Sequence, residues 1–176
     1  MSPATVKNIR VAGIVNDSIV DGPGLRLTVF LQGCDKNCAG CHNPETRAFT
    51  GGVLYTPSDI FERIEKNPLL SGVTFSGGEP LLQAEALLPL AKRIKDFGLT
   101  LAIYTGDVFE DILEKGDPHV LALLSVADTL IDGPFILSEK SLSLPFRGSS
   151  NQRILDVPTS LQTGKAAPEQ SGSWNL

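Results

Sequence analysis

Short apolar runs alternate with stretches of helical spacing along most of the chain. The apolar runs predict strands at residues 9–15, 25–31, 72–76, 100–104 and 129–132, with one more short strand between 146 and 157. The helical spacing predicts helices at residues 57–65, 83–97, 107–115 and 118–126. Because strands and helices alternate without a repeat of fixed length, we expect βαβ units and an α/β fold with a mostly parallel sheet.

Residues that favour helix ends support these boundaries. Thr56 followed by Pro57 is typical of a helix N-terminus, and Asp117 followed by Pro118 repeats the pattern. Gly98 follows the long central helix, where glycine commonly ends a helix. The local sequence therefore agrees with the periodicity.

The length of 176 residues suits one domain, which we place at residues 1–158. Residues 159–176 are rich in Ser, Gly, Gln and Pro, and they predict an irregular tail. Trp174 is expected to anchor that tail to the domain through its apolar ring.

Composition narrows the class of protein. Hydrophobic residues make up 41% of the chain and charged residues 20%, as in ordinary globular proteins. The net charge of -5, without basic runs, argues against nucleic-acid binding. There is no apolar run of about 18 residues and no secretory signal pattern, so we expect a cytoplasmic protein without a membrane span. The three cysteines are odd in number and close together, which fits metal binding better than a disulfide framework.

The cysteines follow the strand at 25–31 with the spacing Cys34-x3-Cys38-x2-Cys41. Such spacing places three thiolates on one tight loop, which can wrap a compact metal centre. Gly33 and Gly40 relieve crowding where the loop must bend.

Three interpretations of this loop compete. A zinc site could recruit His42 as a fourth ligand, but adjacent Cys41 and His42 would have to converge on one ion. A four-iron cluster usually takes four cysteines, so three would leave one iron open and reactive. In the third interpretation the cysteines only pack in the interior. The ligand count favours the cluster.

Other motifs follow the cysteines in a fixed order. Together they resemble the radical S-adenosylmethionine superfamily, whose signature is Cys-x3-Cys-x2-Cys, and within it the activating enzymes of anaerobic (class III) ribonucleotide reductase. The resemblance covers about residues 9–155 and is carried by Asp21-Gly22-Pro23-Gly24-x-Arg26, Gln32-Gly33-Cys34, Cys41-His42-Asn43-Pro44-Glu45-Thr46, Ser76-Gly77-Gly78-Glu79-Pro80, Tyr104-Thr105-Gly106, Asp132-Gly133-Pro134-Phe135 and Arg147-Gly148-Ser149-Ser150-Asn151-Gln152. A lone Gly-Gly-Glu-Pro would be weak, but its place after the cysteine loop is specific.

The resemblance implies an incomplete (βα) barrel with its site at the carboxyl ends of the strands. Cys34, Cys38 and Cys41 would ligate a [4Fe-4S] cluster as its metal ligands and catalytic residues, and S-adenosyl-L-methionine would chelate the open iron. Gly77 and Gly78 would present backbone groups to the methionine end. The implied cofactor-binding set is Gly40, Cys41, His42, Gly77, Gly78, Glu79, Thr105 and Asp132. For Glu79 a turn acid, and for Asp132 a cap, are the alternatives.

The implied function is the activation of a glycyl-radical enzyme. A small electron-donor protein such as flavodoxin or ferredoxin would reduce the cluster, and cleavage of S-adenosylmethionine would yield a 5'-deoxyadenosyl radical. That radical would create the glycyl radical on the catalytic subunit of anaerobic ribonucleotide reductase. The absence of a lysine in Asp132-Gly133-Pro134 tilts the partner away from pyruvate formate-lyase.

Several alternatives stay open at this point. The chain could activate another glycyl-radical enzyme, act on a small molecule, or be a non-catalytic iron-sulfur or zinc module. The polar stretch from Arg147 to Arg153 receives no role.

Overall fold

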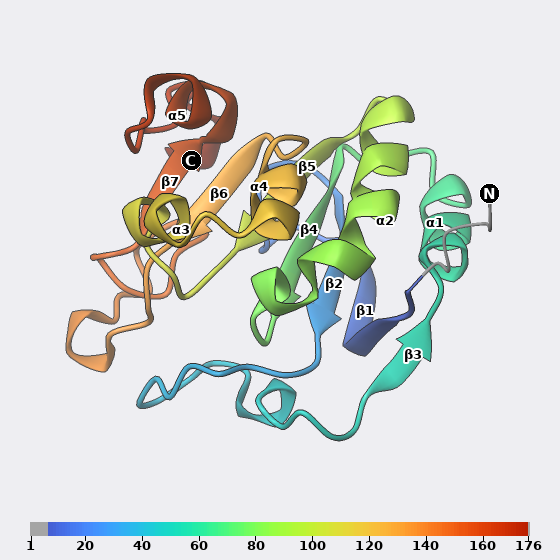
Figure 1. Cartoon of the computed structure of the whole chain (residues 1–176), viewed down its shortest axis with the longest axis horizontal. Coiled ribbons are helices and arrows are strands. Elements are labelled where there is room, and N and C mark those ends of the chain that lie inside the picture. Colours follow the sequence, from blue (N-terminus) through green and yellow to red (C-terminus); the bar gives the residue numbers. More distant parts are fainter. Residues whose placement is uncertain (1–6, 176) are drawn as a thin grey trace.

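The computed structural model describes residues 7–175, and within this range the strands form one mixed sheet of seven strands (Figure 1). The first six residues of the domain expected at 1–158 lie outside the described part. The strands are β1 (Ile9–Ser18), β2 (Arg26–Leu31), β3 (Val53–Tyr55), β4 (Gly72–Gly77), β5 (Thr100–Tyr104), β6 (Thr129–Asp132) and β7 (Arg153–Asp156). Their order in the sheet is β3-β1-β2-β4-β5-β6-β7.

Parallel pairing joins the centre of this sheet. β2 pairs with β4, β4 with β5 and β5 with β6, all in parallel. β1 and β3 at one edge, and β7 at the other, run antiparallel to their neighbours. The α/β class is confirmed, with a mixed sheet whose central strands are parallel.

Helices pack on one face of the sheet. They are α1 (Pro57–Glu65), α2 (Ala84–Asp96), α3 (Phe109–Lys115), α4 (Pro118–Leu124) and α5 (Val157–Thr163), with short 3-10 turns η1 (Pro44–Thr46), η2 (Pro80–Gln83), η3 (Leu137–Glu139) and η4 (Ser173–Asn175). Helices α2 and α4 lie in front of the central strands, while α1 lies beside α2 at the edge formed by β1 and β3 (Figure 1). Apolar side chains of these helices, such as Ile64 and Leu87, share one buried cluster with Val29, Phe75 and Ile103 of the sheet. This cluster is the main core.

The helix starts predicted at Pro57 and Pro118 are confirmed, whereas the helices expected from residues 83 and 107 begin at Ala84 and Phe109. The Thr56 hydroxyl accepts a hydrogen bond from the Asp59 backbone N–H, while the Asp59 carboxylate accepts one from the Thr56 N–H. This reciprocal pair satisfies two backbone donors that the first turn would leave free. Asp117 likewise accepts from the N–H groups of His119 and Val120 at the start of α4.

One strand and one α-helix were not predicted. Strand β3 is only three residues long and gains its place by pairing with β1. Helix α5 begins at Val157, so the expected boundary between domain and tail at residue 158 falls inside a helix. The last strand, expected between 146 and 157, is β7.

The tail returns to the sheet on the face opposite the main core. Trp174 is buried, as expected of an anchor, and packs with Ala102, Ile131 and Ile154. Its ring meets the ring of Phe146 edge-on, with the centroids 5.3 Å apart.

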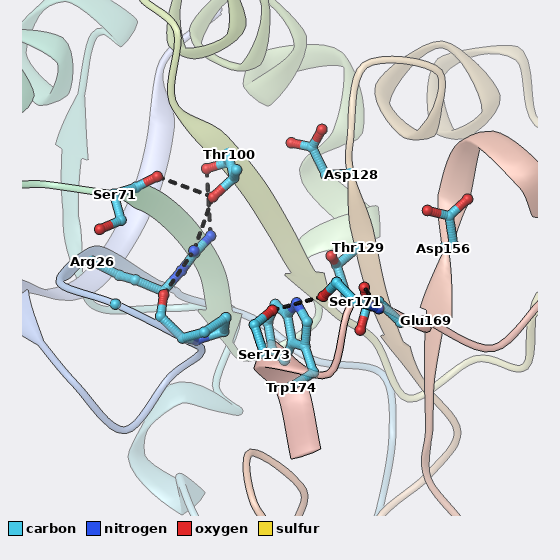
Figure 2. Close-up of a pocket in the computed structure, with 12 residues that line it drawn as sticks. Arg26, Ser71, Thr100, Asp128, Thr129, Asp156, Glu169, Ser171, Ser173 and Trp174 are labelled. Atoms are coloured by element: carbon cyan, nitrogen blue, oxygen red, sulfur yellow. Dashed lines mark hydrogen bonds between the residues drawn. The ribbon is translucent and has the colours of Figure 1, made fainter. Parts of the chain in front are cut away.

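Arg26 is the largest side chain fully buried on this face. Its Nε donates to the Thr74 hydroxyl at 2.7 Å, and its Nη2 donates to the Val73 carbonyl at 2.7 Å. The Trp174 ring lies beside the guanidinium, at 5.9 Å from its central carbon. Figure 2 shows Arg26, Thr100 and Trp174 at a cavity of about 430 Å³. Because Arg26, Thr100 and Thr129 lie at the starts of parallel strands, this cavity is at the amino-terminal edge of the sheet.

No helix of the described residues is long and apolar enough to cross a membrane.

Replacing Trp174 with alanine should remove a buried ring that closes this face. We expect the free energy of unfolding of the metal-free protein to fall by about 3 kcal/mol, measured by urea denaturation. Leu69→Ala is the control, since Leu69 is 75% exposed, and it should change the free energy by less than about 0.5 kcal/mol. Equal effects of the two variants would show that the tail is not anchored by Trp174.

Candidate active site

The carboxyl ends of the parallel strands meet at one edge of the sheet, as βαβ connections require. The chain that follows β2 and the chain that follows β6 run along this edge (Figure 1). A pocket of about 940 Å³ opens here. It is lined by most of the residues singled out in the sequence, namely Cys34, Cys38, Cys41, His42, Gly77, Gly78, Glu79 and Thr105.

The cysteine loop is anchored where it leaves β2. The backbone N–H of Gly33 donates to the Thr46 carbonyl at 2.7 Å, and that of Cys34 donates to the Arg47 carbonyl at 3.1 Å. The Gln32 side chain donates to the Ala48 carbonyl at 2.6 Å. The start of the loop is therefore tied to its return segment, and the three thiols, all half-buried, face one pocket.

The donor set of this loop fits an iron-sulfur cluster. Burial raises the pKa of the Cys34 thiol, partly offset by a hydrogen bond from the Lys36 backbone N–H. In residues 7–175 no group of three His, Cys, Asp or Glu side chains converges on one ion. A cluster does not need such convergence, because each cysteine sulfur binds a different iron.

Two glycines bring the loop after β4 against the cysteine loop. A β-carbon on Gly78 would lie 2.2 Å from the Gly33 carbonyl oxygen, and one on Gly77 would lie 2.6 Å from the Leu31 nitrogen. The Gly78 N–H donates to the Leu31 carbonyl at 2.8 Å, and the Glu79 N–H donates to the Gly33 carbonyl at 2.9 Å. Glycine is thus required here for contact between two backbone segments, in addition to any space it leaves for a ligand.

Glu79 is buried at the wall of the pocket. One carboxylate oxygen accepts from the Thr105 hydroxyl at 2.9 Å and from the Leu81 N–H at 3.1 Å, and the other accepts from the Gly106 N–H at 2.8 Å. Burial raises the pKa of Glu79 to about 7, although these hydrogen bonds act in the opposite direction. Glu79 and Thr105 therefore join the ends of β4 and β5.

The segment after β6 forms the wall beside His42. The His42 and Phe135 rings are 4.5 Å apart at their centroids, and a β-carbon on Gly148 would lie 3.0 Å from His42 Cε1. The Gln152 side chain accepts from the Gly148 N–H at 2.8 Å and donates to the Gly133 carbonyl at 3.1 Å. The polar stretch from Arg147 to Arg153, to which the sequence assigned no role, is thus hydrogen-bonded to the start of the segment after β6.

Two residues of the predicted set do not line the pocket. Gly40 is exposed on the cysteine loop, and a β-carbon there would lie 2.8 Å from Leu137 Cδ1. Asp132 is fully buried, and its carboxylate accepts from the Phe109 N–H at 2.8 Å and from Arg153 Nε at 3.0 Å. These partners tie β6 to β7 and α3, while a role of either residue toward the cofactor stays a prediction.

The lining residues that the sequence did not predict as site residues include Lys36 and Phe135. Lys36 stands between the first two cysteines, and Phe135 stands against His42. Phe135 belongs to the motif Asp132-Gly133-Pro134-Phe135, which could have pointed to it. No sequence pattern points to Lys36, because its partner Asp107 is distant in the chain.

Comparison with known proteins agrees with this geometry. The family described as "4Fe-4S single cluster domain" matches residues 20–155. An anaerobic ribonucleoside-triphosphate reductase-activating protein from Haemophilus influenzae is 36% identical over 146 residues, which cover 77% of this chain and 90% of that protein. The protein of the same description from Vibrio cholerae is 34% identical, with the same coverage. A pyruvate formate-lyase-activating enzyme from Clostridium pasteurianum is 38% identical over 68% of this chain, but over only 54% of its own length.

The raised pKa of Glu79 predicts a pH dependence of stability. The folded protein holds a proton on Glu79 that the unfolded chain releases near pH 4.5, so ionisation of Glu79 destabilises the fold as the pH rises from 4.5 to about 7. We expect the free energy of unfolding of the metal-free wild type, relative to Glu79→Gln, to fall by up to about 3 kcal/mol across this range. Urea denaturation at a series of pH values measures the difference. A difference that rises with pH would mean that the hydrogen bonds outweigh burial.

Replacing Asp132 with asparagine distinguishes a structural role from a cofactor role. Loss of charge-assisted bonds to Arg153 should lower the free energy of unfolding by about 2 kcal/mol, while the affinity of the iron-loaded protein for S-adenosylmethionine stays unchanged. Calorimetric titration measures the affinity, and Asp111→Asn, on the exposed side of α3, is the control. Weaker cofactor binding with unaltered stability would instead assign Asp132 to the cofactor.

Proposed function

Because the chain belongs to the family of anaerobic ribonucleoside-triphosphate reductase-activating proteins, we propose that it generates the glycyl radical of an anaerobic ribonucleotide reductase. It is a radical S-adenosylmethionine oxidoreductase with a [4Fe-4S] cluster. The observation that carries the proposal is the single pocket that holds Cys34, Cys38 and Cys41 together with the Gly77–Glu79 turn.

The fold supports the same proposal. Parallel strands β2, β4, β5 and β6 carry the site at their carboxyl ends, and antiparallel strands flank them on both sides. We propose that this sheet is the incomplete barrel of the radical S-adenosylmethionine type.

The residues present fit the cluster and the cofactor. Cys34, Cys38 and Cys41 would each bind one iron, and the backbone at Gly77 and Gly78 would hold the amino-acid end of S-adenosylmethionine. When bound, the pair supplies one-electron cleavage of a carbon-sulfur bond, which is chemistry that no side chain provides.

The chain's own part is to bind, orient and enclose. Glu79 and Thr105 fix the ends of two strands on which the cofactor would rest. The rings of His42 and Phe135, tilted at 47° to each other, offer an aromatic wall on which the adenine would lie. These contacts are made before any ligand arrives, so they limit reorganisation during the reaction.

The mouth of the pocket suits a protein substrate. Ile19 and Val20 are more than two-thirds exposed, and Leu142 is 94% exposed, although all three line the pocket. Exposed apolar side chains grouped at a site favour a partner that covers them. We assign this partner as the catalytic subunit of the reductase, and the electron donor as a small protein such as flavodoxin or ferredoxin. Reduced, metal-binding cysteines favour the cytoplasm.

The share of each relative's length that the match covers favours the reductase over pyruvate formate-lyase as the partner. The chain spans 90% of the reductase-activating relative but about half of the pyruvate formate-lyase-activating one. Activation of pyruvate formate-lyase is therefore the second candidate.

Anaerobic reconstitution with iron and sulfide tests the function. After reduction with dithionite, the protein should convert S-adenosylmethionine into 5'-deoxyadenosine and methionine, measured by chromatography. Mixed with the reductase, it should produce a glycyl-radical signal in electron paramagnetic resonance. Cys38→Ala should lose both activities while keeping its circular dichroism spectrum, since no disulfide is removed.

The outcomes separate the candidates. A radical on pyruvate formate-lyase and none on the reductase would transfer the assignment to the second candidate. If the wild type binds iron but neither cleaves S-adenosylmethionine nor responds to it spectroscopically, the chain is a non-catalytic iron-sulfur module.

A further inference from the structure

Lys36 links the cysteine loop to the end of β5. Its ammonium donates to Asp107 Oδ1 at 3.0 Å and lies 3.3 Å from Asp35 Oδ1. The side chains of Lys36 and Asp107 are only 23% and 18% exposed, so the pair is partly shielded from water. Partial burial strengthens an ion pair relative to one on the open surface.

Gly106 makes room for this link. A β-carbon on Gly106 would lie 3.0 Å from Lys36 Cγ and 3.5 Å from Lys36 Cε. The contact is with the stem of the lysine, so a larger residue at 106 would require Lys36 to shift by a few tenths of an ångström. Lys36 therefore packs against the end of β5 as well as pairing with it.

The backbone of Lys36 contacts a cysteine directly. Its N–H donates to the Cys34 sulfur at 3.4 Å. Hydrogen bonds to ligand sulfurs are among the factors that set the reduction potential of an iron-sulfur cluster. Whatever holds Lys36 in place therefore also holds a donor on the first cysteine.

Asp107 is itself fixed to the opposite wall of the pocket. Its N–H donates to the Thr105 hydroxyl at 3.1 Å, and Thr105 donates to Glu79 at 2.9 Å. A continuous set of contacts thus runs from Cys34 through Lys36 and Asp107 to the Gly77–Glu79 turn.

We infer that the Lys36–Asp107 ion pair is a strut that fixes the Cys34 side of the cysteine loop against the end of β5. Lys36 is a positioning residue: it acts through the cysteine loop and needs no contact with substrate. The inference rests on the proposed function, because the strut would set the place of the cluster relative to the turn that holds S-adenosylmethionine. Mutation of a residue that holds a metal ligand in place commonly lowers metal affinity or activity by about 10-fold to 100-fold.

Lys36→Met tests the strut because it removes the charge and retains most of the stem. The cluster of the reconstituted variant should be lost to an iron chelator about 10-fold faster than that of the wild type, and its reduction potential should fall. Asp107→Asn should speed up the loss of the cluster to the chelator in the same way, and in this assay the double variant should be no worse than either single variant. Lys36→Arg keeps the positive charge, so its cluster should have the chelation rate and reduction potential of the wild type.

Lys115→Met is the matched control. Lys115 donates to the same Asp107 oxygen at 2.9 Å, but it lies on α3, is 60% exposed and has no place in the cysteine loop. It should leave chelation and potential at wild-type values. If Lys115→Met and Lys36→Met have equal effects, or if Lys36→Met behaves like the wild type, the strut is wrong.

Hydrogen exchange of the metal-free protein separates this inference from the proposed function. Amides of residues 35–41 should exchange faster in Lys36→Met and Asp107→Asn, but not in Lys115→Met. Unchanged exchange in the first two variants overturns the strut even if the wild type assembles its cluster. Faster exchange supports the strut even if the wild type fails to cleave S-adenosylmethionine, a failure that would count against the proposed function alone.

Discussion

The Gly33 carbonyl oxygen lies only 2.2 Å from where a β-carbon of residue 78 would be, and the arrangement of the site depends on this close approach. It allows the backbone after β4 to donate to the backbone after β2 at Gly78 and Glu79. Two loops that follow neighbouring parallel strands are therefore hydrogen-bonded to each other. The loop after β2 brings the cysteines to the pocket, and the loop after β4 brings the predicted cofactor turn.

The carboxyl and amino ends of the parallel strands differ in what their side chains do. At the carboxyl edge, side chains with polar or sulfur atoms face an open pocket. At the amino edge, Arg26 satisfies its donors on Thr74 and Val73 and is covered by Trp174. Since the face opposite the main core contains a buried guanidinium, its stability depends on complete hydrogen bonding. Phe146, packed on Trp174, connects this closed end to the loop that borders the pocket.

Local sequence predicted what local interactions determine. The period of apolar residues located the central strands, and caps such as Thr56 set the helix ends. The direction of β1 and β7 depends on their neighbours in the sheet, so no pattern within either strand could give it. For the site, the order of the motifs along the chain predicted that the three cysteines and the Gly77–Glu79 turn belong to one site. The Lys36–Asp107 pair could not be predicted, because its members are 71 residues apart and neither stands in a periodic position.

The order of the strands also bears on when the site forms. Residues 32–71 connect β2 to β4, two parallel neighbours, and the cysteine loop lies inside this long crossover. Pairing between segments so far apart forms slowly during folding, because the chain must lose much of its freedom before the contact is made. The hydrogen bond from the Glu79 N–H to the Gly33 carbonyl can form only once β4 lies beside β2. The contact between the cysteine loop and the Gly77–Glu79 turn is therefore expected to form late in folding, after the strands on either side of the crossover have paired.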